Sequence, residues 1–240
     1  MKYRKKLMLT ILALAIAVMC QGKVYMVSAG ITDYPGTAND LINCARDAKS
    51  VLEIYKANGP VESQLLTDSR ATISNITRAL EQVFSKAGPN DAVVFYYSGH
   101  GTPGALYVYD GEFKYDILKR ILANSKAGRK MVFVDACFSG KMQQRSGSAQ
   151  ATFKSQNVLF FLSSRETETS QDNAYRNNST FTAFLSRGLR GGADTNKDRI
   201  VTAKELFTFV SKGTKRLTNN KQHPQMVGRF KDSMPIISWK

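Results

Sequence analysis

Two short hydrophobic runs that stop abruptly in small residues constrain the fold of this chain most. Asp91–Gly101 has the sequence DAVVFYYSGHG, and Lys130–Gly140 has the sequence KMVFVDACFSG. Both begin with β-branched and aromatic residues, which is typical of strands that are buried on both faces of a sheet. One run delivers His100 and the other delivers Cys137. Because the carboxyl ends of neighbouring parallel strands share a crevice, we expect this imidazole and this thiol to come within hydrogen-bond reach.

Hydrophobic periodicity along the rest of the chain predicts strands that alternate with helices. The predicted strands are Val24–Ile31, Ser63–Thr67, Asn157–Ser164, a small hairpin at Leu106–Tyr109 and an edge strand at Met234–Ser238. The predicted helices start at Asn39 or Asp40 and at Ser69 or Thr72, and three more cover Tyr115–Asn124, Thr180–Leu189 and Thr202–Leu217. This alternation favours a single α/β domain with a mostly parallel sheet and helices on both faces.

The first 22 residues have the pattern of an export signal. A basic start is followed by 13 apolar residues, Leu7–Met19, and by a small-x-small cleavage site, Cys20-Gln21-Gly22. We expect cleavage before Lys23, a mature domain over residues 23–240, and export to the periplasm, the cell surface or the medium. A lipoprotein signal with an acylated Cys20 is the alternative, and it would attach the protein to a membrane. A retained membrane anchor would need about 18 or more apolar residues.

Charge and cysteine content narrow the classes of partner. The formal charge is +15, and it falls to +11 when the four basic residues Lys2, Arg4, Lys5 and Lys6 leave with the signal. Because the remaining basic residues are scattered among acidic ones, a solvated basic surface is favoured and we expect no nucleic-acid partner. In an exported protein Cys44 and Cys137 would form a disulfide by default. We expect both thiols to stay reduced, because each lies in a motif in which a thiol outside a disulfide would have a function.

His100 and Cys137 carry the chemistry that the sequence predicts. The chain has 2 histidines, and the other, His223, lies beside a proline in a late loop. A Cys137 thiolate could attack a peptide carbonyl and form an acyl-enzyme while His100 protonates the leaving amine. The backbone N–H groups of Gly101 and Cys137 are the expected oxyanion donors, each worth about 3 kcal/mol. This chemistry requires no cofactor, and no third triad member is evident from the spacing. An inert, buried cysteine is the alternative.

Three segments carry a resemblance to a known family. Ser98–Gly101 and Asp135–Gly140 resemble the two catalytic blocks of the caspase-like cysteine peptidases (peptidase family C14), in particular the bacterial metacaspase-like branch. Tyr34–Thr37, followed by Leu41 and Cys44–Asp47, is similar to a third metacaspase segment, although Asn43 and Arg46 depart from its pattern. The resemblance covers about Val24–Ile237. It implies a three-layer αβα sandwich around a mostly parallel six-stranded sheet, and a cysteine endopeptidase activity.

The resemblance also implies a substrate pocket. Cys44, Asp47, Ser98 and Asp135 match the residues that hold the side chain before the scissile bond, and Asp172 is expected at the same rim. Two carboxylates in one pocket select a cation, so the expected substrates are peptides or proteins cleaved after Arg or Lys. Without the family, Asp47 would be read as a helix-surface carboxylate. The alternative function is a catalytically inactive caspase-fold module that binds a partner.

Residues 141–156 follow the nucleophile, where caspase-like peptidases carry a processing loop. The segment contains Lys141, Arg145 and Lys154, so an enzyme specific for basic residues could cut itself there. A plain surface loop explains the polar composition equally well.

A last motif resembles the calcium-binding loop of an EF-hand. The candidate ligands, including the backbone carbonyl of Ile200, are Asp194, Asn196, Asp198, Ile200, Thr202 and Glu205. Arg199 replaces the glycine expected at the sixth loop position, which strains the turn and adds a positive charge near the ion. We therefore expect weak Ca²⁺ binding, and the alternative is a structural turn capped by Asp198 and Thr202. A calcium-responsive interaction protein is thus a further alternative function.

Overall fold

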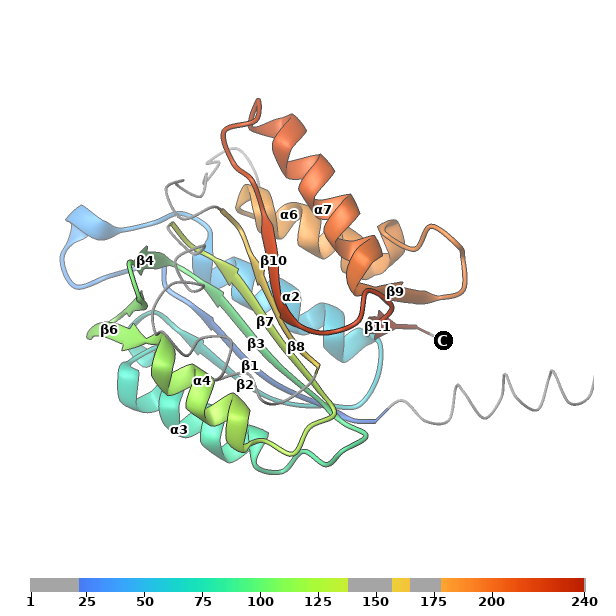
Figure 1. Cartoon of the computed structure of the whole chain (residues 1–240). Coiled ribbons are helices and arrows are strands. Elements are labelled where there is room, and N and C mark those ends of the chain that lie inside the picture. The colour runs from blue at the N-terminus through green and yellow to red at the C-terminus, as the bar shows by residue number, and fades with distance from the viewer. Residues whose placement is uncertain (1–21, 138–156, 165–177, 240) are drawn as a thin grey trace, which may run out of the picture.

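A six-stranded, mostly parallel sheet forms the centre of the computed structural model, which describes residues 22–137, 157–164 and 178–239 (Figure 1). The strand order is β10-β8-β7-β3-β1-β2. The strands are β1 (Val24–Gly30), β2 (Val61–Thr67), β3 (Ala92–Ser98), β7 (Arg129–Asp135), β8 (Val158–Leu162) and β10 (Gln225–Arg229). The neighbouring pairs are parallel except for β10, which runs antiparallel to β8. The predicted fold class is confirmed.

Helices cover both faces of this sheet and make three layers (Figure 1). On one face lie α2 (Cys44–Ala57), α6 (Thr180–Arg187) and α7 (Ala203–Leu217), and on the other lie α3 (Ile73–Phe84) and α4 (Tyr115–Asn124). Along β3 every residue is buried, with Phe95 and Tyr97 in one core and Val94 and Tyr96 in the other. This explains why the strand is hydrophobic throughout rather than alternating with polar residues.

The smaller elements lie at the rims of the sheet. A three-stranded sheet is built from β4 (His100–Thr102), β5 (Ala105–Val108) and β6 (Gly111–Lys114), which confirms the predicted hairpin. A two-stranded sheet joins β9 (Ile200–Thr202) to β11 (Pro235–Ser238). The short helical turns are η1 (Thr37–Asn39), η2 (Asp68–Arg70) and the π-helical η4 (Gly188–Gly192).

The predicted start of the first helix is wrong by one turn. The helix α2 begins at Cys44, after Asn43, instead of at a cap formed by Asn39 or Asp40. The carboxylate of Asp40 accepts a hydrogen bond from the backbone N–H of Tyr34 (3.0 Å) and so holds a loop together. That loop folds over the end of β1, because Thr32 accepts a hydrogen bond from the N–H of Ala45 (2.9 Å).

The predicted edge strand is also placed differently. Met234–Ser238 forms β11, which pairs with β9 outside the main sheet, whereas the edge of the main sheet is β10. No strand was expected at β10, because its sequence Gln225–Arg229 contains a glycine, Gly228, and shows no alternation of apolar and polar residues. The strand forms because the backbone groups at the outer edge of β8 need hydrogen-bond partners.

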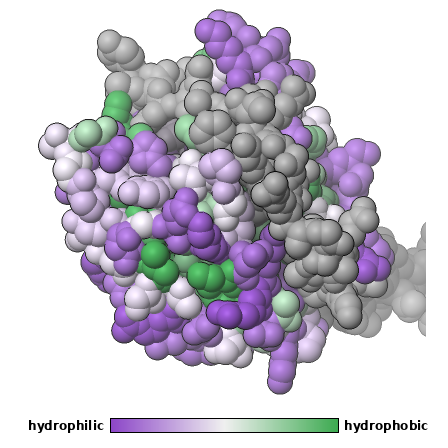
Figure 2. Space-filling model, turned by 60° about the vertical axis from the view of Figure 1, so that its left-hand side comes forward, coloured by the Kyte–Doolittle hydropathy of each residue, from purple (hydrophilic) through white to green (hydrophobic). Residues whose placement is uncertain are grey.

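The face that carries β4 and β6 is largely hydrophilic where the structure describes it, with hydrophobic side chains in small groups only (Figure 2). Ile42 is the exposed large hydrophobic residue of the described part, at 52% exposure. No helix within the described ranges is long and apolar enough to cross a membrane. Residues 1–21 of the predicted export signal, which include Cys20, lie outside the described residues, as do the segment 141–156 and Asp172.

Candidate active site

The register of two neighbouring strands brings the predicted nucleophile and base to one place. In the parallel pair β3–β7 the last partners are Ser98 and Asp135, so both segments leave the sheet at the same point. His100 and Cys137 each lie two residues beyond that pair. A Cβ atom added to Gly101 would lie 2.3 Å from the carbonyl oxygen of Cys137, which shows how closely the two segments approach. Only glycine, which has no Cβ, permits this close approach. The approach places Gly101 beside Cys137, and the predicted oxyanion site requires these two residues to be neighbours.

The imidazole of His100 is held by a backbone atom. Its Nε2 lies 2.8 Å from the carbonyl oxygen of Asn39, the last residue of η1. Because a carbonyl oxygen only accepts hydrogen bonds, the neutral imidazole carries its proton on Nε2 and keeps a lone pair on Nδ1. Asn39 thus orients the imidazole of His100. The sequence contains no signal for this group, since any residue offers a backbone carbonyl.

Tyrosines hold the backbone around His100. The N–H of His100 donates to the hydroxyl of Tyr34 (2.9 Å), and the two rings pack with centroids 4.9 Å apart. The Tyr34 hydroxyl donates in turn to the carbonyl of Tyr107 (3.0 Å). Burial raises the pKa of Tyr34 to about 12, so the hydroxyl stays neutral beside the imidazole. A Cβ on Gly99 would lie 2.5 Å from the Tyr97 hydroxyl, so glycine is required there as well.

Serines at the end of β8 brace the turn that presents Cys137. The N–H of Ala136 donates to Ser163 Oγ (3.1 Å), and Ser164 Oγ donates to the carbonyl of Ala136 (3.3 Å). Neither Cys137, which is partly buried, nor Cys44, which is buried, forms a disulfide, as predicted. A hydrogen-bonded turn therefore carries a partly exposed thiol.

Three of the predicted pocket residues are buried near one another. Asp47 in the first turn of α2, Ser98 at the end of β3 and Asp135 at the end of β7 are all buried. Ser98 Oγ donates to Asp47 Oδ2 (3.1 Å), and Cys44 is buried one turn before Asp47 on the same helix. The reading of Asp47 as a helix-surface carboxylate is wrong, because its exposure is 0%.

Residues around the start of α6 complete the pocket and were not predicted. Ser179 Oγ donates to Asp47 Oδ2 (2.6 Å), and Asn178 Nδ2 donates to Asp47 Oδ1 (2.7 Å). Thr182 Oγ1 donates to Asp135 Oδ2 (2.8 Å). The sequence places Ser179 directly before a predicted helix. That position indicates a helix cap, but it does not indicate a contact with a distant carboxylate.

The carboxyl group of Asp47 lies in a buried environment close to a second carboxyl group. Burial, together with the negative charge of Asp135, raises the pKa of Asp47 to about 7, although the hydrogen bonds from Ser179 and Asn178 oppose that rise. In the described part of the chain no lysine, arginine or histidine forms an ion pair with Asp47. A positively charged ligand would supply the missing countercharge.

The EF-hand-like loop is a hydrogen-bonded turn. Asp194 accepts the N–H of Arg199 (3.1 Å), Asn196 accepts the N–H of Asp198 (3.1 Å), and Asp198 accepts the N–H of Ile200 (2.8 Å). Glu205 forms a capping box with Thr202 at the start of α7 and also accepts the Thr195 hydroxyl. The described residues contain no group of three or more His, Cys, Asp or Glu that could hold a metal. Several of the candidate ligand oxygens thus accept hydrogen bonds from the loop itself, whereas Asp194 Oδ1 is buried with no hydrogen-bond partner among the described residues. Calcium binding at this loop stays a prediction.

Comparisons with known proteins agree with this architecture. The family model "Caspase domain" matches residues 27–233. The chain is 35% identical over 109 residues to "Metacaspase-1" of Scheffersomyces stipitis, covering 40% of this chain and 26% of that protein. It is 32% identical over 149 residues to "Metacaspase-1A" of Aspergillus terreus, covering 50% of this chain and 37% of that protein. The alignments thus span about a quarter to about a third of these relatives.

Solved structures share the fold at low sequence identity. A crystal structure of a protein from Geobacter sulfurreducens superposes with a TM-score of 0.68 at 19% identity, covering 91% of this chain and 100% of that one. Caspase-1 from Spodoptera frugiperda superposes with a TM-score of 0.69 at 16% identity, covering 92% of this chain and 91% of that one.

Proposed function

The chain belongs to the caspase-domain family of peptidases, and from this premise we propose that it is a cysteine endopeptidase that hydrolyses peptide bonds after Arg or Lys. The observation that carries the proposal is the pair of buried, interacting carboxyl groups of Asp47 and Asp135, of which Asp135 lies two residues before Cys137. Peptides and proteins with a basic residue before the scissile bond are the proposed substrates.

The proposed reaction begins with proton transfer from the Cys137 thiol to the free Nδ1 of His100. The thiolate attacks the peptide carbonyl, so a C–S bond forms and the carbonyl oxygen becomes an oxyanion. The N–H groups of Gly101 and Cys137 stabilise that oxyanion, each by about 3 kcal/mol. The C–N bond then breaks as the imidazolium protonates the leaving amine, and water activated by His100 hydrolyses the thioester. The hydrogen bond to Asn39 keeps Nδ1 directed at the reaction throughout.

Specificity in this proposal comes from charge. An Arg or Lys side chain in the pocket would lower the pKa of Asp47 and pair with its ionised form, which burial alone disfavours. An acidic side chain would add a negative charge to a buried site that already holds two carboxylates, which is strongly unfavourable. A neutral side chain would leave the pocket without a countercharge.

The test is the initial hydrolysis rate of three reporter peptides that differ only in the residue before the reporter bond, which is Arg, Lys or Asp. We expect turnover of the Arg and Lys peptides and none of the Asp peptide, and a loss of at least about 1000-fold in Cys137→Ala, the scale seen when a nucleophile is removed. Turnover of the Asp peptide would contradict the pocket assignment. Absence of turnover on all three would favour the catalytically inactive binding module.

We also propose that the mature protein is exported and starts at Lys23. The backbone nitrogen of Lys23 lies 2.8 Å from the carboxylate of Asp91, one residue before β1. Cleavage there would convert this hydrogen bond into an ion pair with the new amino terminus. Mass spectrometry of the exported protein checks the site, and a lipid on Cys20 would instead indicate membrane attachment.

A further inference from the structure

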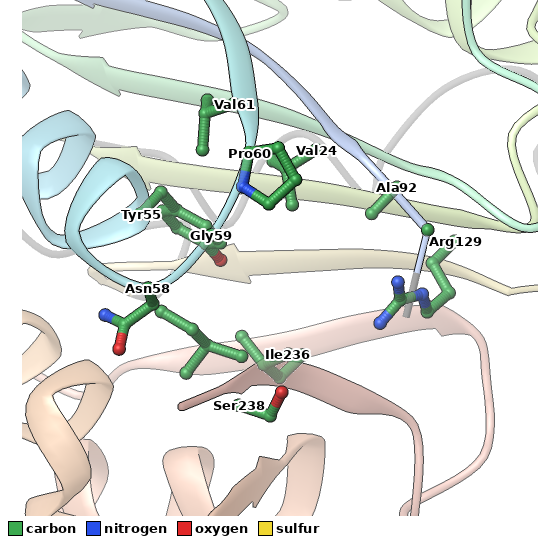
Figure 3. Close-up of a pocket in the computed structure, with 12 residues that line it drawn as sticks. Val24, Tyr55, Asn58, Gly59, Pro60, Val61, Ala92, Arg129, Ile236 and Ser238 are labelled. Atoms are coloured by element: carbon green, nitrogen blue, oxygen red, sulfur yellow. The ribbon is translucent and has the colours of Figure 1, made fainter. Parts of the chain in front are cut away.

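A small cavity lies at the end of the sheet opposite the candidate active site (Figure 3). Its volume is about 50 Å³, and it is bordered by the in-register first residues of three strands, Val24, Ala92 and Arg129. The end of α2 and the strand β11 border it on other sides. Apolar side chains make up much of its lining, namely Val24, Pro60, Val61, Ala92, Ile236 and Ile237. The polar side chains that line it are those of Tyr55, Asn58, Arg129 and Ser238.

The hydroxyl of Tyr55 lines this cavity without a partner. Tyr55 is 2% exposed, and its Oη forms no hydrogen bond within the described structure. The buried hydroxyls of Tyr34 and Tyr96, in contrast, both have partners. An unsatisfied buried hydroxyl costs folding free energy and is rare in native structures, so it indicates that something else accepts its hydrogen bond.

The guanidinium of Arg129 faces the same space from the opposite side (Figure 3). It has one long hydrogen bond, from Nη1 to the carbonyl of Pro235 (3.4 Å), and no ion pair with a carboxylate of the described residues. The nearby Asp91 carboxylate is engaged by the backbone N–H groups of Lys23 (2.8 Å) and Gly88 (2.8 Å). The guanidinium therefore has no direct ion pair among the described residues, although the charge of Asp91 acts on it from a distance and opposes the lowering of its pKa.

Electrostatic effects of the two groups on each other agree with this geometry. Burial lowers the pKa of Arg129 and raises that of Tyr55, and the positive charge of Arg129 partly offsets the rise at Tyr55. A negative ligand between them would favour both the charged guanidinium and the neutral, donating hydroxyl.

We propose that this cavity binds a small carboxylate anion with a short alkyl chain. The guanidinium of Arg129 would receive the carboxylate as a bidentate partner, and Tyr55 Oη would donate a further hydrogen bond to it. The apolar part of the lining suits an alkyl group, and the guanidinium supplies the charge that a carboxylate requires. The site is separate from the peptidase chemistry, because Arg129 begins the strand that ends at Asp135.

The experiment titrates ¹³C-labelled acetate into the purified protein and measures binding by ligand-observed NMR at constant ionic strength, with chloride as the balancing anion. We expect saturable binding that Arg129→Gln abolishes and that Tyr55→Phe weakens about tenfold, as for the loss of one hydrogen bond to a charged group. The matched controls are Arg78→Gln, which removes an exposed cation from α3, and Tyr115→Phe, which removes another unpartnered buried hydroxyl. Both controls should bind acetate as the unmodified protein does.

Melting temperatures make the test independent of whether Arg129→Gln folds. Without acetate, Tyr55→Phe should melt no lower than the unmodified protein, since it removes an unsatisfied hydroxyl. With acetate, the unmodified protein and Tyr115→Phe should both gain melting temperature, and Tyr55→Phe should gain much less. Non-saturable acetate binding, equal binding by Tyr55→Phe, or tighter binding of inorganic phosphate than of acetate would each overturn the proposal.

Discussion

The hydrogen bond from Ser179 to Asp47 offers a sharp test of the proposed specificity pocket. Ser179 Oγ donates to the buried Asp47 Oδ2 at 2.6 Å, and this bond favours the ionised form of the carboxyl group. In Ser179→Ala the bond is lost, so the pKa of Asp47 should rise further above its ordinary value. Because a basic substrate pairs with the ionised form, binding should then require a higher pH.

The magnitude follows from the contacts that remain. A hydrogen bond to a charged group contributes about 1.5–3 kcal/mol, which corresponds to about one to two pKa units. Asn178 Nδ2 (2.7 Å) and the N–H of residue 179 (3.2 Å) still donate to Asp47 in the variant, so we expect the lower end, about one unit. With a pKa of about 7 in the unmodified protein, the ionised fraction at neutral pH falls from about a half to about a tenth. Apparent affinity for an Arg peptide should then drop about fivefold at pH 7 and recover at pH 9.

The assay measures the dissociation constant of an Arg-containing peptide by calorimetry from pH 5 to pH 9. It uses Cys137→Ala as the parent, so that neither turnover nor thiol ionisation contributes to the profile. In the parent, binding should strengthen as pH rises through about 7, since Asp47 then loses its proton. The matched control is Ser50→Ala. Ser50 accepts a hydrogen bond from Asn178 (3.3 Å) but forms none with Asp47 within the described structure, so its loss should leave the pH profile unchanged. A profile for Ser179→Ala that superimposes on the parent's, or that moves to lower pH, would refute the reasoning.

Three further substitutions test other parts of the molecule. Gly101→Ala would place a Cβ 2.3 Å from the carbonyl oxygen of Cys137, so kcat/KM on the Arg reporter should fall about 100-fold, as expected for a displacement of about 1 Å. The control Gly59→Ala has no atom within 4 Å of the new Cβ and should change kcat/KM little. Equal rates for the two variants would contradict the proposed approach of the segments. Asp47→Asn should lower kcat/KM on the Arg reporter by about 100-fold, because a buried substrate cation then lacks one of its two carboxylates; an unchanged value would exclude Asp47 from the pocket. Thr202→Ala removes the capping box of α7, so the free energy of unfolding, measured in urea, should fall by about 1 kcal/mol while kcat/KM stays the same. A loss of activity would instead link this turn to the active site.

The strands could be predicted from the sequence because burial on both faces leaves a direct mark on it. The runs that form β3 and β7 are continuous, hydrophobic and end at the residues that the structure places at the rim of the sheet. The start of α2 could not be predicted in the same way, since Asn39 and Asp40 are good capping residues in any context. Only the tertiary contact of Asp40 with the Tyr34 N–H decides that they stay in a loop. Likewise β10 depends on the free edge of β8 rather than on its own residues.

The candidate site likewise contains residues that could be predicted from the sequence and residues that could not. Cys137 and His100 could be proposed as nucleophile and base because their side chains have distinctive chemistry and because each follows a buried strand at equal distance from a register pair. The groups that hold them are of kinds that occur everywhere in proteins. Asn39 contributes a backbone carbonyl, and Ser163 and Ser179 contribute hydroxyls from segments far away in the sequence. Since such groups fix the tautomer of the base and the charge of the pocket, the reaction that this sequence predicts takes its geometry and its pH dependence from contacts that only the folded chain reveals.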